Sequence, residues 1–267
     1  MKKRLIFCAA VIAQCVVCSA LADDSFLRLD QTPDSLSYLP SPPAAKSEAF
    51  KLDKEAYHQG YKLKGSARWK LAASDADLSD ANIGKPFSQA FGIDITPENT
   101  PITYDILKKL REDSGDLASK LAKEHYMRQR PFMVFNTPTC LPKEEAALRK
   151  NGSYPSGHTA IGWSTVLVLS EIRPDRQNEL LKRGYDFGQS RVICGAHWKS
   201  DVNAGYLVGA AEVARLHADS GFMDELAKAK LEIGKKLPSQ TTATLSLTGK
   251  TATGQATTEP VTPATAK

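Results

Sequence analysis

The chain is poor in cysteine, and most of its cysteines lie near the N-terminus. Of five cysteines in 267 residues, Cys8, Cys15 and Cys18 fall within the first 22 positions, so only Cys140 and Cys194 lie beyond them. Two cysteines allow at most one disulfide, which we expect if the chain is exported; two buried free thiols are the alternative. Closing that 54-residue separation would stabilise the fold by about 4 kcal/mol in the chain-entropy model.

An excess of charge of one sign is also missing. The formal net charge is +5, and Lys2, Lys3 and Arg4 supply three of these charges, which leaves +2 for a chain without its first 22 residues. No basic patch with interleaved aromatic residues occurs either. Both observations speak against nucleic-acid binding, and we expect no nucleic-acid partner.

Long hydrophobic runs are absent after residue 22. The apolar segment from Thr159 to Leu169 is soon followed by Glu171 and Arg173, and it is shorter than the roughly 20 residues that a membrane-spanning helix needs. We therefore expect no stable insertion of the mature chain into a membrane.

Residues 1–22 have the layout of a secretory signal peptide. A basic start at positions 2–4 precedes an apolar stretch from Leu5 to about Val17, and Ala20-Leu21-Ala22 form a small-residue cleavage site. This predicts a mature chain that begins at Asp23 and a periplasmic location. A retained anchor and a lipid-modified Cys18 are the less favoured alternatives.

Alternating strand-like patterns are scarce, whereas helical patterns recur with breaks, so the sequence predicts an all-α fold with a single helical domain. The expected helices cover residues 53–63, 66–77, 101–113, 115–129, 157–172, 175–193, 200–218 and 221–236. The proline-rich residues 23–50 are interpreted as an extended arm without core residues. The helical domain covers 51–237, and the Thr-, Ala- and Pro-rich residues 238–267 are expected to be disordered.

Three short segments carry the groups that phosphoryl transfer needs. They contain three cations, a small-residue turn and two histidines: Lys123 and Arg130-Pro131, then Pro155-Ser156-Gly157-His158, then Ser190-Arg191 with His197 and Asp201. The transition state spreads negative charge over three equatorial oxygens, which fixed cations stabilise. Ser156 and Gly157 begin the expected helix 157–172, whose free N–H groups can bind an anion.

The two histidines are expected to have different roles. Asp201 lies four residues after His197, where its carboxylate can accept the Nδ1 proton and leave Nε2 free to attack phosphorus. His158 has no such carboxylate and lies beside the anion-binding turn, which suits a general acid. Gly195 disfavours an unbroken helix through His197, so we expect His197 on a turn before the helix that holds Asp201.

The pattern Lys-x6-Arg-Pro, Pro-Ser-Gly-His and Ser-Arg-x5-His-x3-Asp resembles that of class A bacterial nonspecific acid phosphatases. These belong to the superfamily of type 2 phosphatidic acid phosphatases and vanadium haloperoxidases, and the resemblance runs from about Leu39 to about Lys236. It implies an all-α bundle of that type. It also implies metal-independent hydrolysis of phosphomonoesters at acidic pH through a phosphohistidine, and in some members hydrolysis of nucleoside di- and triphosphates.

Carried over residue by residue, the resemblance gives each motif position a role. Phosphate binding falls to Lys123, Arg130, Ser156, Gly157 and Arg191, proton donation to His158, and phosphohistidine formation, with orientation by Asp201, to His197. We expect small phosphorylated substrates and neither a metal nor another cofactor. The family resemblance is compatible with a homo-oligomer, for which the sequence itself has no signal.

Three alternatives remain open. A vanadate-dependent haloperoxidase would use a similar pocket, although this chain is short for that family. A noncatalytic phosphate-binding protein is disfavoured because both histidines and Asp201 are present. Zinc bound by His158, His197 and Asp201 is disfavoured because three cations nearby would repel it.

Overall fold

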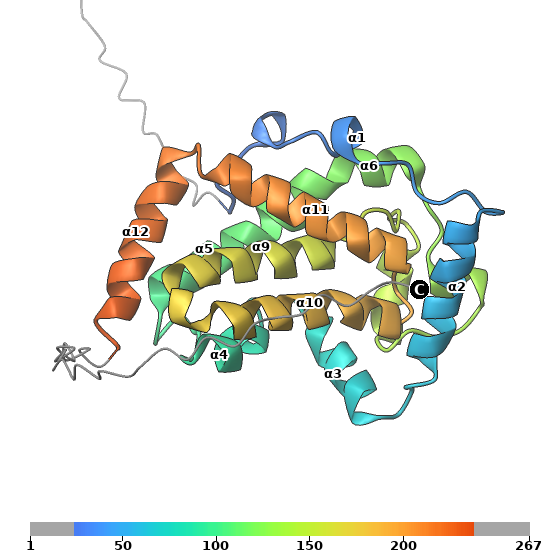
Figure 1. Cartoon of the computed structure of the whole chain (residues 1–267), viewed down its shortest axis with the longest axis horizontal. Coiled ribbons are helices and arrows are strands. Elements are labelled where there is room, and N and C mark those ends of the chain that lie inside the picture. The colour runs from blue at the N-terminus through green and yellow to red at the C-terminus, as the bar shows by residue number, and fades with distance from the viewer. Residues whose placement is uncertain (1–23, 238–267) are drawn as a thin grey trace, which may run out of the picture. The chain divides into compact units, whose positions relative to one another are not determined.

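A single apolar helix, α9 (Gly157–Ile172), forms the centre of the fold. The computed structural model describes residues 24–237, and eleven of the sixteen residues of α9 are buried. A helix that is apolar on all sides must be covered on all sides. Helices α10 (Gln177–Ile193) and α11 (Lys199–Leu216) pack along α9 (Figure 1).

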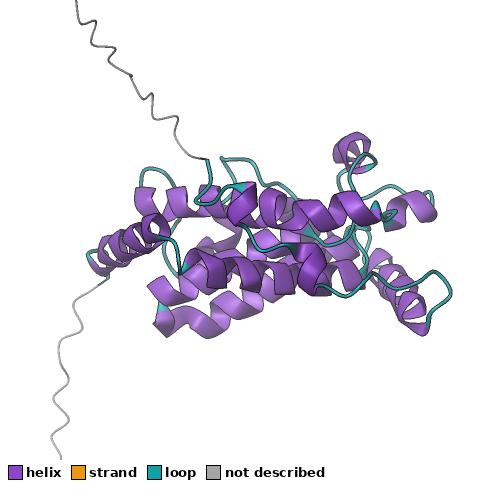
Figure 2. Cartoon of the chain, turned by 90° about the horizontal axis from the view of Figure 1, so that it is seen from above, coloured by secondary structure: helices purple, strands orange, loops and turns teal. Residues whose placement is uncertain are grey.

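The other helices surround these three. In chain order they are α1 (Ser35–Tyr38), α2 (Glu48–Tyr61), α3 (Ala67–Asp75), α4 (Lys85–Phe91), α5 (Pro101–Leu110), α6 (Ala118–Tyr126), α7 (Pro131–Val134), α8 (Glu145–Leu148) and α12 (Ser220–Gly234). Figure 2 shows that residues 24–237 contain helices and loops but no strand. The predicted all-α class is confirmed.

The helix boundaries differ from the prediction where the pattern is short or interrupted. Helix α9 has its predicted bounds, whereas α4 was not predicted because its seven residues carry only Phe87 and Phe91 as buried apolar groups. The predicted break after residue 113 is also absent. A π-helical segment, Arg111–Leu117, instead connects α5 to α6 without interruption.

The predicted disulfide is present between Cys140 and Cys194. It links the loop after α7 to the end of α10, and the Cys140 N–H also donates a hydrogen bond to the Cys194 carbonyl at 3.2 Å. The alternative of two free thiols is therefore wrong.

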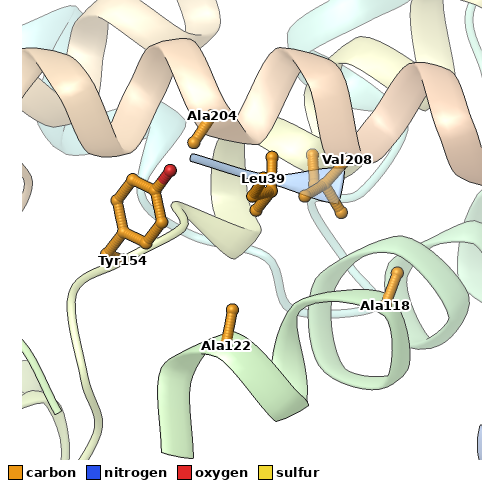
Figure 3. Close-up of a cluster of buried hydrophobic side chains, with 7 residues drawn as sticks. Leu39, Ala118, Ala122, Tyr154, Ala204 and Val208 are labelled. Carbon is orange, nitrogen blue, oxygen red and sulfur yellow. The ribbon is translucent and has the colours of Figure 1, made fainter. Parts of the chain in front are cut away.

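The expectation that residues 23–50 hold no core residues is also wrong. Leu27 and Leu39 are buried, and α2 already begins at Glu48. Leu39 packs in a cluster with residues of α6 and α11 (Figure 3), namely Ala118, Ala122, Ala204 and Val208, together with Tyr154. Isolated leucines among prolines show no periodicity, so the sequence pattern did not reveal this contact.

Two predicted segments, the signal peptide 1–22 and the tail 238–267, lie outside the described residues. Within residues 24–237, no helix combines the length and the apolar character needed to cross a bilayer.

The contact between α9 and α11 depends on Gly209. A Cβ atom at this position would lie 2.6 Å from the Ala160 carbonyl oxygen and 3.2 Å from the Ser164 nitrogen, both in the backbone of α9. We predict that Gly209→Ala lowers the free energy of unfolding by about 1–3 kcal/mol, the usual cost of overpacking. Denaturant unfolding measures this change.

The matched control is Gly234→Ala in α12, where a Cβ would have no neighbour within 4 Å. This variant should be unchanged or more stable by up to about 1 kcal/mol, since alanine favours the helix. Equal unfolding midpoints for Gly209→Ala and the wild type would show that the two helices do not approach this closely.

Candidate active site

His197 lies on a turn between α10 and α11, as the sequence predicts. Gly195 has a φ of 73°, in the left-handed region that glycine adopts without strain, and this turn ends α10. The His197 side chain is 2% exposed. Its Nδ1 donates to the Ser153 carbonyl at 2.8 Å, and Nε2 lies 2.9 Å from Nη1 of Arg130.

These contacts define the protonation of the ring. A carbonyl can only accept a hydrogen bond and a guanidinium can only donate one, so Nδ1 carries the proton and Nε2 holds a lone pair. The lone pair of the His197 ring is therefore on Nε2.

Arg130 is fixed by backbone carbonyl groups. It lies immediately before α7, is 1% exposed, and donates from Nε to the carbonyls of Leu148 and Asn151 at 3.0 and 3.2 Å. Its Nη1 also donates to the Ala196 carbonyl at 3.1 Å. Because carbonyl groups carry no formal charge, they position the guanidinium without neutralising it.

Lys123 lies in the last turn of α6 and is held in the same way. Its Nζ donates to the Gly152 carbonyl at 3.1 Å, and Arg130 Nη2 reaches the same oxygen at 3.3 Å. Burial and the charge of Arg130 lower the pKa of Lys123 to about 7. Burial likewise lowers the pKa of Arg130 to about 10.

Arg191, in the last turn of α10, is buried with incomplete hydrogen bonding. It is 3% exposed, and its Nε and Nη1 have no hydrogen-bond partner among the described residues. Burial, followed by the charge of Arg130, lowers its pKa to about 9. Buried donors without partners are rare, and here they fit a site that receives an anion.

The N-terminus of α9 adds backbone donors. Ser156 is the N-cap, and its Oγ accepts from the Thr159 nitrogen at 3.3 Å. The N–H groups of Gly157 and His158 occupy the first helical positions, which have no acceptor within the helix. Free N–H groups at a helix N-terminus are suited to donate hydrogen bonds to an anion.

His158 follows this turn and is partly exposed. Its Nε2 donates to the Ala76 carbonyl at 2.9 Å, which leaves Nδ1 for proton exchange. Burial, then the charge of Arg191, lowers the pKa of His158 well below its usual value.

The contact expected between Asp201 and His197 is looser than predicted. The Asp201 Oδ2 atom lies 3.5 Å from Nδ1 of His197, whereas the Ser153 carbonyl is the closer acceptor. Asp201 is fully buried, and its carboxylate instead accepts from the Trp198 N–H at 2.8 Å and from Arg128 Nη1 at 2.5 Å. Burial raises its pKa to about 6, while Arg128 opposes the rise.

Sequence reasoning did not identify Arg128 or Ser153. A backbone carbonyl leaves no signal in residue type, so the role of Ser153 could not be read from the sequence. Arg128 is a third cation in the segment that also contains Lys123 and Arg130, and this was the one available signal of its role.

A cavity of about 310 Å³ lies among these groups. Five of the predicted residues line it, namely Lys123, Arg130, Gly157, His158 and His197, whereas Ser156, Arg191 and Asp201 do not. The arrangement can hold a tetrahedral anion beside Nε2 of His197, with His158 at the same cavity.

The depressed pKa of Lys123 leads to a prediction about proton uptake. Near its pKa of about 7, the free protein holds Lys123 partly neutral, and a bound dianion favours the charged form. Binding of tungstate, which itself carries no proton in this range, should therefore take up protons. Its affinity should fall as the pH rises above about 7.

Titration calorimetry in buffers of different ionisation enthalpy measures this uptake. Lys123→Met should bind tungstate more weakly and should take up fewer protons at the same pH. Equal proton uptake by the variant and the wild type would mean that another group titrates.

Comparisons with known proteins identify the family of this chain. A family model described as the PAP2 superfamily matches residues 114–220, a range that contains all eight predicted site residues. A non-specific acid phosphatase of Salmonella typhimurium is 54% identical over 207 residues, which cover 78% of this chain and 83% of the relative. Proteins of the same name from Salmonella typhi (49% identical, 88% and 94% covered) and Providencia stuartii (46%, 88% and 99%) are also similar. The chain belongs to the PAP2 superfamily, among its non-specific acid phosphatases.

Proposed function

We propose that this acid phosphatase hydrolyses phosphomonoesters through a covalent phosphate on Nε2 of His197, without a metal ion. The observation that carries the proposal is the state of the imidazole. Its Nδ1 proton is bound to the Ser153 carbonyl, and its Nε2 lone pair accepts a hydrogen bond from Arg130, which lines the same cavity as His197. A neutral, oriented imidazole beside fixed cations suits nucleophilic attack on a phosphate ester.

In the first step, the Nε2 lone pair of His197 attacks phosphorus and the bond from phosphorus to the ester oxygen breaks. His158 gives a proton to the departing oxygen, so the alcohol leaves neutral. The phosphorylated imidazole keeps its Nδ1 proton and gains positive charge, which the Ser153 carbonyl and the Asp201 carboxylate stabilise.

In the second step, a water molecule attacks phosphorus while His158 accepts one of its protons. The bond from phosphorus to Nε2 breaks, inorganic phosphate leaves, and both histidines return to their starting states. His158 thus acts as an acid and then as a base, as microscopic reversibility requires.

The cations account for the acidic working range in this scheme. Burial and Arg191 depress the pKa of His158 in the free protein. A bound phosphate dianion offsets the positive charge around His158 and raises its pKa, so the acid form is present at mildly acidic pH. Lys123, Arg130 and Arg191 stabilise the negative charge that develops on the equatorial oxygens of the transition state, a role that a metal ion has in other phosphatases.

The proposal includes export and a broad substrate range. The disulfide fits an oxidising compartment, and N-terminal sequencing of the exported protein would test cleavage before Asp23. A second cavity, of about 380 Å³, shares Asp116, Lys123 and Asn151 with the site and is also lined by Lys120, Lys150 and Glu124, so lysines outnumber carboxylates there. These lysines support hydrolysis of nucleoside di- and triphosphates, which comparison of rates on ADP and AMP would test.

Acid-quench trapping tests the covalent step. During turnover of a labelled phosphomonoester, the wild type should carry acid-labile, base-stable phosphate on His197. His197→Ala should carry none and should lose at least about 10³-fold in kcat, as nucleophile removal does elsewhere. Label on another residue, or full activity of His197→Ala, would refute the proposed intermediate.

The dependence of kcat on the leaving group tests whether His158 is the proton donor. We expect His158→Ala to lose about 10²- to 10⁴-fold in kcat on an alkyl phosphate, the range of general acid catalysis. An activated aryl phosphate needs little protonation of its leaving oxygen, so its loss should be much smaller. Equal losses on both esters would show that His158 is not the proton donor.

A further inference from the structure

Arg128 connects two buried carboxylates on different helices. It lies in the short segment between α6 and α7, and its side chain is 10% exposed. Nη1 donates to Asp201 at 2.5 Å, and Nη2 donates to Asp53 of α2 at 2.8 Å. The two carboxylate side chains are 0% and 3% exposed, so one guanidinium lies between two anions with little access to water.

Asp53 holds the start of α11 as well. One carboxylate oxygen accepts from the Ser200 nitrogen at 2.8 Å, and the other accepts from the Ser200 hydroxyl at 2.5 Å. Arg128 Nη1 also donates to that hydroxyl at 2.7 Å. Through these bonds α2 positions the helical turn that carries Asp201.

Two aromatic rings lie beside the guanidinium. Its central carbon lies 5.6 Å from the centre of the Phe50 ring and 5.5 Å from that of Trp198. A planar guanidinium can stack on such rings while it donates to two carboxylates, which a lysine cannot do. The site is therefore specific for arginine.

We propose that Arg128, itself held by Asp53, is a positioning residue that fixes the charged Asp201 carboxylate toward Nδ1 of His197. The inference rests on the proposed function, because the charge it serves is the one that forms on the phosphorylated imidazole. Asp201 lies 3.5 Å from Nδ1, so a small displacement of this carboxylate changes its interaction with that charge. Neither Arg128 nor Asp53 touches the cavity that receives the substrate.

The charges around Asp201 determine the expected pH dependence. The groups that face it from neighbouring elements are Asp53 of α2, Lys123 of α6, Arg128 and Arg130 before α7, Tyr154 before α9, and His197. Burial raises the pKa of Asp201 to about 6, and Arg128 is the first of the groups that oppose the rise. Loss of the Arg128 charge should therefore raise this pKa further, and Asp201 should become neutral at a higher pH.

The experiment measures kcat against pH, inhibition by inorganic phosphate, and thermal unfolding for three variants. Arg128→Gln should lose up to about 10²-fold in kcat, as small misplacements near a reacting group do, and its acidic limb should shift to higher pH. In Arg128→Lys the acidic limb of the pH profile should return to its wild-type position, because lysine keeps the positive charge. Only part of kcat should return, because lysine lacks the planar guanidinium that donates to two carboxylates. Asp53→Asn should lower kcat less than Arg128→Gln, since Arg128 still pairs with Asp201. Phosphate inhibition should be unchanged in all three.

Arg173→Gln is the matched control. Arg173 is also buried, lies 2.7 Å from Asp175 and contacts the Phe91 ring, but it follows the far end of α9. It should unfold at a lower temperature and keep the wild-type kcat and pH profile. If Arg128→Gln does not fold, Arg128→Lys and Asp53→Asn decide by the same measurements.

The outcomes separate this inference from the proposed function. If wild-type His197 carries trapped phosphate and the Arg128 and Asp53 variants lower kcat equally at every pH, or not at all, the positioning role is wrong and the phosphohistidine stands. If the wild type carries no phosphate on His197, the proposed phosphohistidine mechanism is wrong, and the inference about Arg128 that rests on it is wrong as well.

Discussion

The site is governed by the burial of several positive charges in one place with too little negative charge to balance them. Lys123, Arg130 and Arg191 all have lowered pKa values because they are buried, and mutual repulsion adds to the effect for Lys123 and Arg191. Such an arrangement costs stability in the free protein. A phosphate dianion relieves that cost, so the same charges that destabilise the empty site stabilise the bound anion and the transition state.

The fold keeps these charges in place mainly with uncharged groups. Carbonyl oxygens from the segment before α9 and from the turn before α11 hold Arg130, Lys123 and the imidazole of His197. The disulfide ends at Cys194, directly before the glycine of that turn. Carboxylates would have fixed the cations more strongly but would also have cancelled their attraction for phosphate. Two carboxylates are exceptions: Asp201, which pairs with Arg128, and Asp116, which lines the cavity and interacts with the charge of Lys123.

The features that could be predicted are those that the residue types within short segments of the sequence determine. The apolar run of α9, the break at Gly195 and the pairing of Cys140 with Cys194 were visible in the sequence. The motif spacing identified five of the residues that line the cavity, together with three that do not line it. The contact of Leu39 with α11, the Ser153 carbonyl and the bond from Asp53 to Arg128 were not visible. Each of these contacts joins segments far apart in the chain or uses a backbone atom. Interactions of these two kinds leave no periodic or compositional signal in the sequence. The π-helical segment was missed because Ser114-Gly115 resembles a helix break.

The most direct test of the central claim is a crystal structure of the protein with bound tungstate. We expect one tetrahedral anion that accepts hydrogen bonds from Arg191, Arg130 and Lys123 and from the N–H groups at the start of α9. We also expect Nε2 of His197 to be directed at the central atom. An anion bound elsewhere, or one that leaves Nε and Nη1 of Arg191 without a partner, would contradict the account.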